Sequence, residues 1–466
     1  MNMPIQRLLN ENYRRLELAG NAYLFHVPST SLFELSQEST EALKGLETGT
    51  LHWSALDPQT AEEFSQLDLI GQPGKRHADV TIERFPAKAL VLNVASGCNL
   101  SCTYCYKSDL TSMANGGNMT FDTAREAIDL FYAESPNRKE YTVTFFGGEP
   151  LGNLPLIRQV IAHAVSFFAA RDAEVKFTMT TNATLLTPSV VRELHDSRVD
   201  LTISIDGPEA IHNRTRVFES GQGSYAAVIK NLSAVRSVYT DRVVAARVTL
   251  TRGITDVVGI WEHLHRTLGF REIGFAPATS GDNAIFNLTG NEIAEVFAAF
   301  KRLGEHYLQE AFENRYNGFS NLHRVLGDIH EGRKKRLPCG AGVGLISVSY
   351  KGTIDLCHRF TGSDFTTFGS VQTGLDKPAL GRFLESRAND REGDCATCHI
   401  RNLCAGGCYH ESYVRYGDPS LPVLHYCDIM RDWIDYALQA YIRISERNPL
   451  FFDTYFKKGE FTYETL

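Results

Sequence analysis

The sequence predicts an α/β protein in which a partial (β/α)6 barrel stands between a small N-terminal module and a cysteine-rich C-terminal domain. Three observations predict this fold class. Apolar strand patterns and amphipathic helix patterns alternate along the chain from residue 88 onward. Short strand candidates around turn residues precede them, and a loop-rich stretch rich in cysteine follows them. We expect three units, formed by residues 1–85, 86–315 and 316–466.

The length and charge of the chain agree with this division and restrict the function. A chain of 466 residues corresponds to about three domains. The net charge is −8, which disfavours binding to nucleic acid or to an anionic membrane as the main role. Because no apolar run approaches the ~18 residues of a membrane span, and because the chain starts with the polar stretch MNMPIQRLLNENYRR, we expect a cytoplasmic protein.

The first 85 residues predict a separate small module. Two short strands are expected at residues 22–27 and 32–35, on either side of a Pro-Ser-Thr-Ser turn. A helix is expected at residues 39–46, and a second helix begins near Asp57 and Pro58. The segment 71–76 has the composition of a linker. Two interpretations remain open, a decorating subdomain and a winged-helix-like element that recognises a peptide.

The barrel is expected from the order of its strands and helices. The first strand, residues 89–94, is apolar throughout, as is typical of a strand buried on both faces. Parallel strands need helical crossovers, and six units fall short of the eight that close a barrel, so we expect an open side. The other strands are expected at 141–146, 176–180, 201–205, 245–250 and 272–276. The helices are expected at 121–133, 154–170, 188–197, 225–238, 256–268, 291–314 and, near the C-terminus, 436–445.

The ten cysteines indicate metal or redox chemistry. Structural disulfides are rare in a reducing cytoplasm, so clustered cysteines there favour metal binding. No cysteine lies between Cys105 and Cys339, a gap that cysteines scattered as small buried residues would not leave. The first group is Cys98, Cys102 and Cys105, and the second is Cys339, Cys357, Cys395, Cys398, Cys404, Cys408 and Cys427.

The first group directly follows the first barrel strand, with the spacing Cys98-x3-Cys102-x2-Cys105. Zinc is one interpretation, but structural zinc normally has four ligands, and no histidine lies close by. A [4Fe–4S] cluster has four irons that each take one external ligand. Three cysteines leave one iron open, where a small molecule can bind.

The run SGCNLSCTYCY resembles the signature of the radical S-adenosylmethionine (SAM) superfamily, with Tyr104 at the aromatic position before the third cysteine. The resemblance implies that SAM chelates the open iron and is cleaved by one electron to methionine and a 5′-deoxyadenosyl radical. That radical abstracts a hydrogen from the substrate. The cofactor carries this chemistry, and the protein supplies position and the exclusion of water.

Further elements at successive strand ends, where barrel enzymes carry their sites, resemble the SAM-binding elements of that family. The Gly-Gly-Glu-Pro stretch at 147–150 would hold the SAM amino group, and its glycines would let the backbone approach a ligand. Ser204 and Asp206 would contact the ribose, and Arg216 would reach the SAM carboxylate, although Asn213 stands where the family has Asp. The resemblance implies that SAM is bound by Tyr104, Gly147, Gly148, Glu149, Thr181, Asn182, Ser204, Asp206 and Arg216.

The second group of cysteines resembles the SPASM extension of radical SAM peptide-modifying enzymes, which carries two auxiliary [4Fe–4S] clusters. A zinc ribbon is the alternative, but it would leave three of the seven cysteines unexplained. The resemblance implies three clusters in all, one that binds SAM and two auxiliary ones. It assigns Cys339, Cys357 and Cys408 to the first auxiliary cluster, and Cys395, Cys398, Cys404 and Cys427 to the second.

The number of cysteines predicts an open iron. Two fully ligated clusters need eight cysteines, and the second group has seven. Fully ligated relatives carry an extra cysteine shortly after the position of Cys339, whereas here the stretch is GAGVGLISVSY. A thiolate of the substrate is a natural fourth ligand to this iron. Formylglycine-forming relatives also carry an Asp after the position of Cys357, and this chain has His358, which would relay a proton, orient the peptide or serve only as a surface or supporting group.

Together these features resemble a thioether-forming peptide maturase, most like the family that matures the γ subunit of quinohemoprotein amine dehydrogenase. That resemblance implies Cys-to-Asp or Cys-to-Glu crosslinks in a ribosomally made polypeptide, for which that γ subunit is a candidate. It also implies an electron donor such as flavodoxin or ferredoxin. The alternatives are an anaerobic sulfatase maturase that forms formylglycine, another radical SAM peptide-modifying enzyme, and a non-catalytic iron–sulfur or zinc scaffold that binds peptides.

Overall fold

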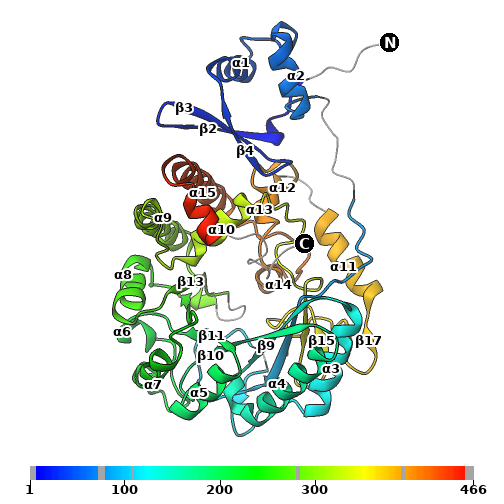
Figure 1. Cartoon of the computed structure of the whole chain (residues 1–466), viewed down its shortest axis with the longest axis vertical. Helices are drawn as coiled ribbons and strands as arrows, with labels where there is room; N and C mark the ends of the chain where they lie inside the picture. Colours follow the sequence, from blue (N-terminus) through cyan, green and yellow to red (C-terminus); the bar gives the residue numbers. More distant parts are fainter. Residues whose placement is uncertain (1–6, 72–78, 108, 280–283, 390–393, 457–466) are drawn as a thin grey trace.

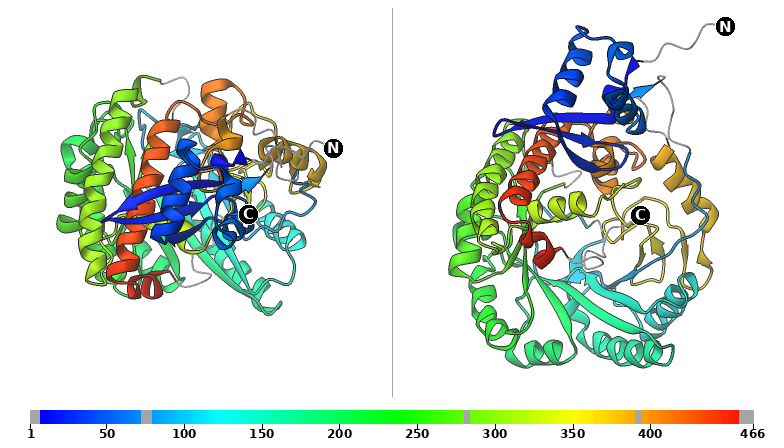
Figure 2. Two further views of the ribbon diagram at one scale, coloured as in Figure 1. Left: turned by 90° about the horizontal axis from the view of Figure 1, so that it is seen from above. Right: turned by 45° about the horizontal axis from the view of Figure 1, so that its top comes forward.

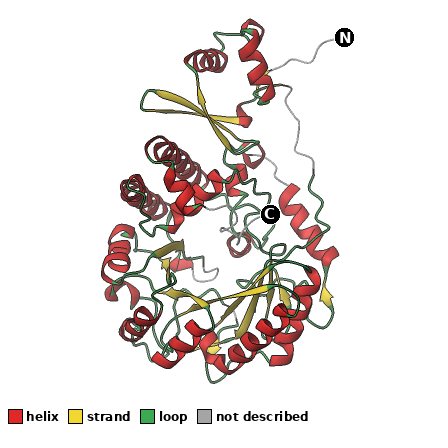
Figure 3. Cartoon of the chain, viewed as in Figure 1, coloured by secondary structure: helices red, strands yellow, loops and turns green. Residues whose placement is uncertain are grey.

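An eight-stranded sheet curves through the lower half of the molecule in Figure 1 and carries helices on its outer face. The computed structural model describes residues 7–71, 79–107, 109–279, 284–389 and 394–456. The strand order is β13-β12-β11-β10-β9-β6-β14-β15. Figure 3 shows the same arrangement by element type, with the strands inside and the helices outside.

All six expected barrel strands form, and each pairs in parallel with its neighbour, which confirms the predicted fold class. Every residue of the first strand is buried, as its apolar sequence predicts. The strands are β6 (Ala89–Ala95), β9 (Glu140–Gly147), β10 (Glu174–Thr181), β11 (Val199–Ser204), β12 (Ala245–Leu250) and β13 (Glu272–Pro277).

The barrel helices begin where the sequence offers N-terminal caps. Thr120 caps the first and Thr187 caps the third, each by accepting a hydrogen bond from a backbone N–H of the first turn. The helix expected at 256–268 is an α-helix followed by a short π-helical segment, η4 (His263–Thr267). The helices are α3 (Phe121–Glu134), α4 (Leu154–Ala169), α5 (Pro188–Asp196), α6 (Glu209–His212), α7 (Tyr225–Val238), α8 (Val257–Glu262) and α9 (Gly290–Phe312).

Two strands from beyond the expected barrel boundary extend its sheet. β14 (Leu345–Val348) lies parallel to β6, and β15 (Ile354–Asp355) pairs with β14 in the antiparallel direction. The sequence analysis did not predict them, because each is short and embedded in a glycine-rich stretch. Cys357 follows β15 by two residues, so the start of the cysteine-rich domain is attached to the barrel wall.

The N-terminal module is a three-stranded antiparallel sheet, β2-β3-β4, followed by two helices. The two expected strands are confirmed as β3 (Asn21–His26) and β4 (Ser31–Leu35), and the two helices as α1 (Gln37–Thr48) and α2 (Pro58–Gln66). β2 (Tyr13–Leu18) was not expected, because its charged sequence, YRRLEL, does not look like a strand. The short strands β1 (Arg7–Leu8) and β5 (Ile70–Gly71) pair at its base, and all but the first residue of the expected linker lies outside the described residues.

The module stands on the cysteine-rich domain, above α12, α13 and α15 (Figures 1 and 2). Asn402 donates a hydrogen bond of 2.7 Å to the carbonyl oxygen of Val27, and Arg401 donates to the carbonyl oxygen of Glu11. Arg14 forms an ion pair of 2.7 Å with Asp435. Helix α13, which lies between Cys398 and the end of the helix at Cys404, therefore contacts the module directly.

The C-terminal region contains more helix than the sequence indicated. The last long helix, expected at 436–445, is α15 and begins nine residues earlier, at Cys427. Its apolar residues, among them Trp433, Ile434 and Leu438, are buried, while charged residues such as Asp428 and Arg431 in its first turns obscured the helix in the sequence. No described helix is long and apolar enough to cross a membrane. The helices are α10 (Ser320–His330), α11 (Lys377–Asn389), α12 (Asp394–Thr397), α13 (Arg401–Cys404), α14 (Tyr409–Tyr416), α15 (Cys427–Arg447) and α16 (Leu450–Tyr455).

Candidate active site

A cavity of about 910 Å³, which we call the lumen, runs through the barrel. Residues from the first cysteine group and from the ends of successive barrel strands line it. Asp206 is not part of this lining and lies behind it. The expected site residues in the lining are Cys98, Cys102, Tyr104, Cys105, Gly147, Gly148, Glu149, Thr181, Asn182, Ser204, Arg216 and His358.

Gly147 and Gly148 are required by backbone packing against the cysteine loop. A Cβ on Gly148 would lie 2.3 Å from the carbonyl oxygen of Gly97, and one on Gly147 would lie 2.4 Å from that of Ala95. The Gly148 N–H donates to the carbonyl oxygen of Ala95 at 2.8 Å, and the Glu149 N–H donates to that of Gly97 at 2.9 Å. The close approach that we expected toward a ligand is therefore made to the strand end that carries Cys98.

Gly148→Ala is expected to lower the free energy of unfolding by about 1–3 kcal/mol, because the added methyl group meets fixed backbone and pushes the cysteine loop away. The iron bound at the first cysteine group should fall with it. Gly290→Ala is the matched control, since a Cβ there meets no atom within 4 Å. Thermal unfolding and iron analysis of both variants measure the difference, and equal stability of the two would contradict this packing.

Glu149 is a buried carboxyl group held by three donors. Its oxygens accept hydrogen bonds from the Thr181 hydroxyl at 2.6 Å, the Asn182 N–H at 2.8 Å and the Leu151 N–H at 3.2 Å. Burial raises the pKa of Glu149 to about 7, against the opposing effect of these donors. A carboxylate has about four acceptor positions, so one remains for a further donor such as an ammonium group.

Arg216 is fixed by Asp206. Its Nε donates to Oδ2 of Asp206 at 2.8 Å, and the same oxygen accepts from the Tyr104 hydroxyl at 2.7 Å. The other oxygen of Asp206 accepts from the Thr249 N–H at 2.9 Å. Asp206, for which we expected a ribose contact, thus bonds three protein donors and orients Arg216 and Tyr104, while Ser204 of the same expected pair lines the lumen.

Arg216→Lys is expected to weaken SAM binding by about tenfold or more, because hydrogen bonds to charged groups contribute about 1.5–3 kcal/mol each. Lysine keeps the charge but loses the planar guanidinium, which bonds Asp206 and would bond the carboxylate of SAM with its other N–H groups. The iron content should stay unchanged. Arg214→Lys, an exposed neighbour, is the control. Equilibrium binding of SAM to both variants measures the effect, and unchanged affinity for Arg216→Lys would refute the assignment.

The three cysteines of the first group lie close enough to influence one another's ionisation. Burial raises the pKa of the Cys98 thiol to about 12 and that of Cys102 to about 11. Asn182 donates a hydrogen bond of 3.8 Å from Nδ2 to the sulfur of Cys98. Burial thus favours the neutral thiols, and a bound metal would favour the thiolates, because cysteine ligands are deprotonated.

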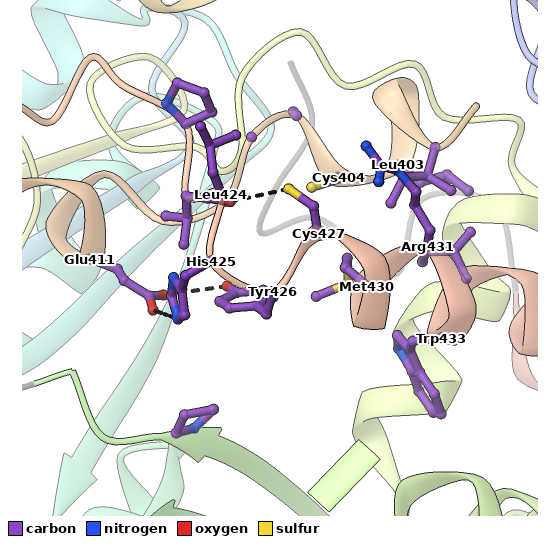
Figure 4. Close-up of a pocket in the computed structure, with 18 of the residues that line it drawn as sticks. Leu403, Cys404, Glu411, Leu424, His425, Tyr426, Cys427, Met430, Arg431 and Trp433 are labelled. Carbon is purple, nitrogen blue, oxygen red and sulfur yellow. Dashed lines mark hydrogen bonds and ion pairs between the residues drawn. The ribbon is translucent and has the colours of Figure 1, made fainter. Parts of the chain in front are cut away.

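A second cavity, of about 560 Å³, brings together Cys395, Cys398, Cys404 and Cys427. Figure 4 shows Cys404 and Cys427 on facing segments of this cavity. The other three cysteines lie elsewhere. Cys357 and Cys408 interact electrostatically with each other, and Cys339 packs against the same apolar cluster as Cys357. The division of these seven cysteines between two clusters stays a prediction.

His358 lies on the wall of the lumen next to Phe146, with 4.4 Å between the ring centroids. Its Nδ1 is buried and has no hydrogen-bond partner among the described residues. Burial lowers the pKa of His358 to about 3, helped by the nearby cations Arg359, Lys107 and Arg247. The imidazole is therefore neutral near pH 7, and it can accept a proton or bond a substrate group.

Comparison with known families identifies the barrel. Residues 92–264 match the family model described as the radical SAM superfamily. Over these residues the barrel is therefore similar to the radical SAM superfamily. The match covers β6 to η4 and includes the first cysteine group and all the strand ends described above.

Several curated proteins are similar in sequence. The radical SAM cyclopropyl synthase TigE of Paramaledivibacter caminithermalis is 28% identical over 372 residues, which cover 74% of this chain and 72% of that protein. A cysteine-type anaerobic sulfatase-maturating enzyme of Clostridium perfringens is 21% identical, covering 77% of this chain and 98% of the enzyme. The uncharacterized protein MJ0907 of Methanocaldococcus jannaschii is 31% identical over 150 residues, and this chain spans about half of it, 49%.

Two solved structures have the same fold. One is described as native anSMEcpe with bound AdoMet and Cp18Cys peptide, with a TM-score of 0.66, 18% identity and coverage of 77% of this chain and 98% of that one. The other is Streptococcus suis SuiB bound to precursor peptide SuiA, with a TM-score of 0.53, 14% identity and coverage of 90% and 98%. Both of these structures are described with a bound peptide, and both share the fold of this chain.

Similarity to the radical SAM superfamily implies one [4Fe–4S] cluster and SAM, and the lumen has groups that fit both. Cys98, Cys102 and Cys105 would hold the cluster, and Glu149 and Arg216 offer an acceptor and a cation for the amino and carboxylate groups of SAM. Among the described residues, no three His, Cys, Asp or Glu side chains lie close enough to hold one metal ion. Zinc needs ligands within ~2.3 Å of one point, whereas the ligands of a cubane cluster each bind a different iron.

Five cations that line the lumen were not predicted from the sequence: Lys107, Arg242, Arg247, Arg324 and Arg359. One signal was available. Arg247 stands in the middle of a strand, AARVTL, whose neighbours are buried or half-buried, and a charged residue in such a strand is unusual. No comparable signal marks Arg324, which comes from α10, outside the regular barrel units.

Proposed function

We propose that this radical SAM protein installs thioether crosslinks between Cys sulfur and methylene carbons of Asp or Glu in a ribosomally made polypeptide. The observation that carries the proposal is the position of the three-cysteine group. His358 and Arg359, which directly follow Cys357, line the lumen, and Nη1 of Arg359 donates to the sulfur of Cys408 at 3.9 Å. An auxiliary cluster with an open iron would therefore adjoin the space where hydrogen is abstracted.

The residues divide the work as follows. Cleavage of SAM at its cluster supplies a 5′-deoxyadenosyl radical. Glu149 and Arg216 hold the amino and carboxylate groups of SAM, and Asp206 keeps Arg216 in place. Cys339, Cys357 and Cys408 hold the first auxiliary cluster, which would bind the substrate thiolate and fix its direction. The thiol proton is released to solvent, because the low pKa of His358 makes its imidazole a weak base, and the neutral ring can bond a substrate group.

The overall reaction balances for each link. One C–H bond and one S–H bond of the peptide break, and one C–S bond forms. The hydrogen atom ends in 5′-deoxyadenosine, the thiol proton goes to solvent, and one electron returns to the protein. The first reduction of the SAM-binding cluster needs an external one-electron donor, such as flavodoxin or ferredoxin. The peptide becomes lighter by two hydrogens per link.

The substrate partner is a polypeptide with Cys and Asp or Glu residues, on the pattern of the amine dehydrogenase γ subunit. The peptides named with SuiB and anSMEcpe support a peptide substrate for this chain as well. We propose that the N-terminal module recognises this polypeptide, since its sheet and helices form a separate unit on top of the cysteine-rich domain.

The second candidate is a sulfatase maturase that forms formylglycine, favoured by the near-complete coverage of the Clostridium perfringens enzyme. His358 in place of an Asp and the seven cysteines of the second group argue against it. A non-catalytic peptide-binding scaffold would not need a lumen lined with Glu149, Arg216 and three thiols.

Co-expression with the peptide encoded beside the gene, followed by alkylation and mass spectrometry, tests the proposal. We expect a product two hydrogens lighter per link, with one fewer alkylatable thiol per link. An aldehyde that reacts with a hydrazine probe would instead establish the sulfatase-maturase reading. A peptide with every thiol still open to alkylation would also reject thioether formation.

A further inference from the structure

Arg247 projects into the barrel from the middle of β12. It is exposed there, while Ala246 and Val248 on either side of it are buried. Its guanidinium reaches across the next strand, because a Cβ on Gly274 of β13 would lie 3.2 Å from Nη1 of Arg247. The absence of a side chain at Gly274 thus leaves the space that this guanidinium occupies.

Arg247 stands where the two cavities meet. It lines both the lumen and the cavity that holds Cys404 and Cys427, and so does Arg324 of α10. β13 is an edge strand of the curved sheet, so this junction lies at the open side of the barrel. A polypeptide that enters from that side meets Arg247 before it reaches the first cysteine group.

The surroundings of Arg247 favour an anion. Lys107, Arg247 and Arg359 all line the lumen together with His358. In the described part of the chain, three acidic groups also line the lumen, fewer than its cations. Asp200 pairs with Arg242 at 3.6 Å, Glu149 accepts from Thr181, and Glu272 interacts electrostatically with Arg324. The part of the lumen around His358 is therefore positively charged. It also contains the buried Nδ1 of His358, which has no hydrogen-bond partner among the described residues.

We infer that Arg247 binds a side-chain carboxylate of the substrate polypeptide and presents the adjoining methylene group toward the SAM end of the lumen. The planar guanidinium matches a carboxylate in two parallel hydrogen bonds, which fixes direction as well as distance. Nδ1 of His358 can donate to the same carboxylate. Because the methylene is bonded directly to the carboxyl carbon, fixing the carboxylate fixes the carbon from which hydrogen is taken.

This inference rests on the proposed function and names the part of the lumen that selects Asp or Glu. Arg247 is a positioning residue in this account, because it holds the substrate and does not exchange hydrogen or electrons with it. A glutamine amide carries no negative charge and has only one acceptor oxygen, so it should be held less tightly than a carboxylate in the same place.

The test measures binding to the holoenzyme with SAM, and it uses three tripeptide probes. Ac-Gly-Glu-Gly-NH2 carries a side-chain carboxylate, Ac-Gly-Gln-Gly-NH2 carries none, and Ac-Gly-Gln-Gly-OH carries only a terminal one. We expect the Glu probe to bind about tenfold more tightly than the amide-capped Gln probe, because one hydrogen-bonded charge pair is lost. Arg247→Gln should remove this ratio, and Arg192→Gln, on the exposed face of α5, should keep it.

Three results would overturn the inference. One is an unchanged ratio in Arg247→Gln whose iron content and SAM binding match the wild type. Another is equal binding of the Glu probe and the probe with the free terminus, which would assign the site to a chain end. If Arg247→Gln misfolds, Arg247→Lys, which keeps the charge, must show a reduced ratio, and a full ratio there would reject the bidentate contact.

The test of the carboxylate site at Arg247 can fail without failure of the proposed function, and the reverse also holds. If Arg247→Gln formed thioethers at the wild-type rate, the carboxylate site would be rejected while the proposed function stood. If the tripeptide preference depended on Arg247 but no thioether formed in the co-expressed peptide, the site would stand and the proposed function would fall.

Discussion

Replacing Cys98, Cys102 and Cys105 together by Ala should abolish SAM cleavage completely and remove about a third of the iron, about four of the twelve irons expected from three cubane clusters. The reason is geometric. These three sulfurs line the lumen together with Glu149 and Arg216, and SAM can bind only the iron that they leave open. Iron analysis after anaerobic purification, and assay of 5′-deoxyadenosine with dithionite as reductant, measure both effects.

A second variant makes this result specific. Replacing Cys404 and Cys427, which face the other cavity, should also lower the iron content but leave dithionite-driven SAM cleavage in place. Loss of cleavage in both variants to the same extent would mean that the two groups do not have separate roles. Zinc in place of iron in the wild-type protein would reject the cluster assignment outright.

The other large effect is expected at the three-cysteine group. Cys408→Ala leaves only Cys339 and Cys357 of the three thiols that would hold the first auxiliary cluster. It also removes the sulfur that accepts a hydrogen bond from Arg359. Crosslinking should be lost, while SAM cleavage should continue without product. Crosslinking should also be lost when the peptide's Cys is changed to Ser. We expect peptide binding to change the spectrum of the cluster, and this change should be absent with the Ser peptide.

The control for this prediction is Arg359→Lys, which keeps the cation beside Cys408 and all seven cysteines of the second group. Crosslinking should persist in that variant, although more slowly, because lysine lacks the planar fork that contacts Cys408 and Thr279. Full crosslinking by Cys408→Ala would contradict the assignment of this cysteine to the cluster that binds substrate.

The six barrel strands could be predicted from the sequence because each is a run whose burial alternates or is complete, bounded by a helix of regular period. β14 and β15 could not, since a strand of four residues and one of two acquire their structure from the sheet that they join. β2 was not predicted for a similar reason. Its pattern of charged residues is compatible with a strand only because Tyr13 and Leu16 face a core formed by other segments.

The candidate site, too, has features that the sequence predicts and features that it does not. Cysteine spacing and the strand-end motifs point to the residues of the lumen, because chemistry there depends on residue type and local order. The packing role of Gly147 and Gly148 and the bonding of Asp206 to Tyr104, Arg216 and Thr249 depend on segments far apart in the chain. Sequence order alone does not bring those segments together, and the same holds for Arg247 and Arg324.

The central claim, that hydrogen is taken from an Asp or Glu methylene, is tested most directly by isotope transfer. The peptide encoded beside the gene is prepared with deuterium on its Asp and Glu side-chain methylenes, and separately with deuterium on the β carbon of Cys. The account predicts deuterium in 5′-deoxyadenosine from the first peptide and none from the second. Deuterium from the Cys-labelled peptide alone would contradict the claim and identify the reaction as oxidation at the cysteine β carbon.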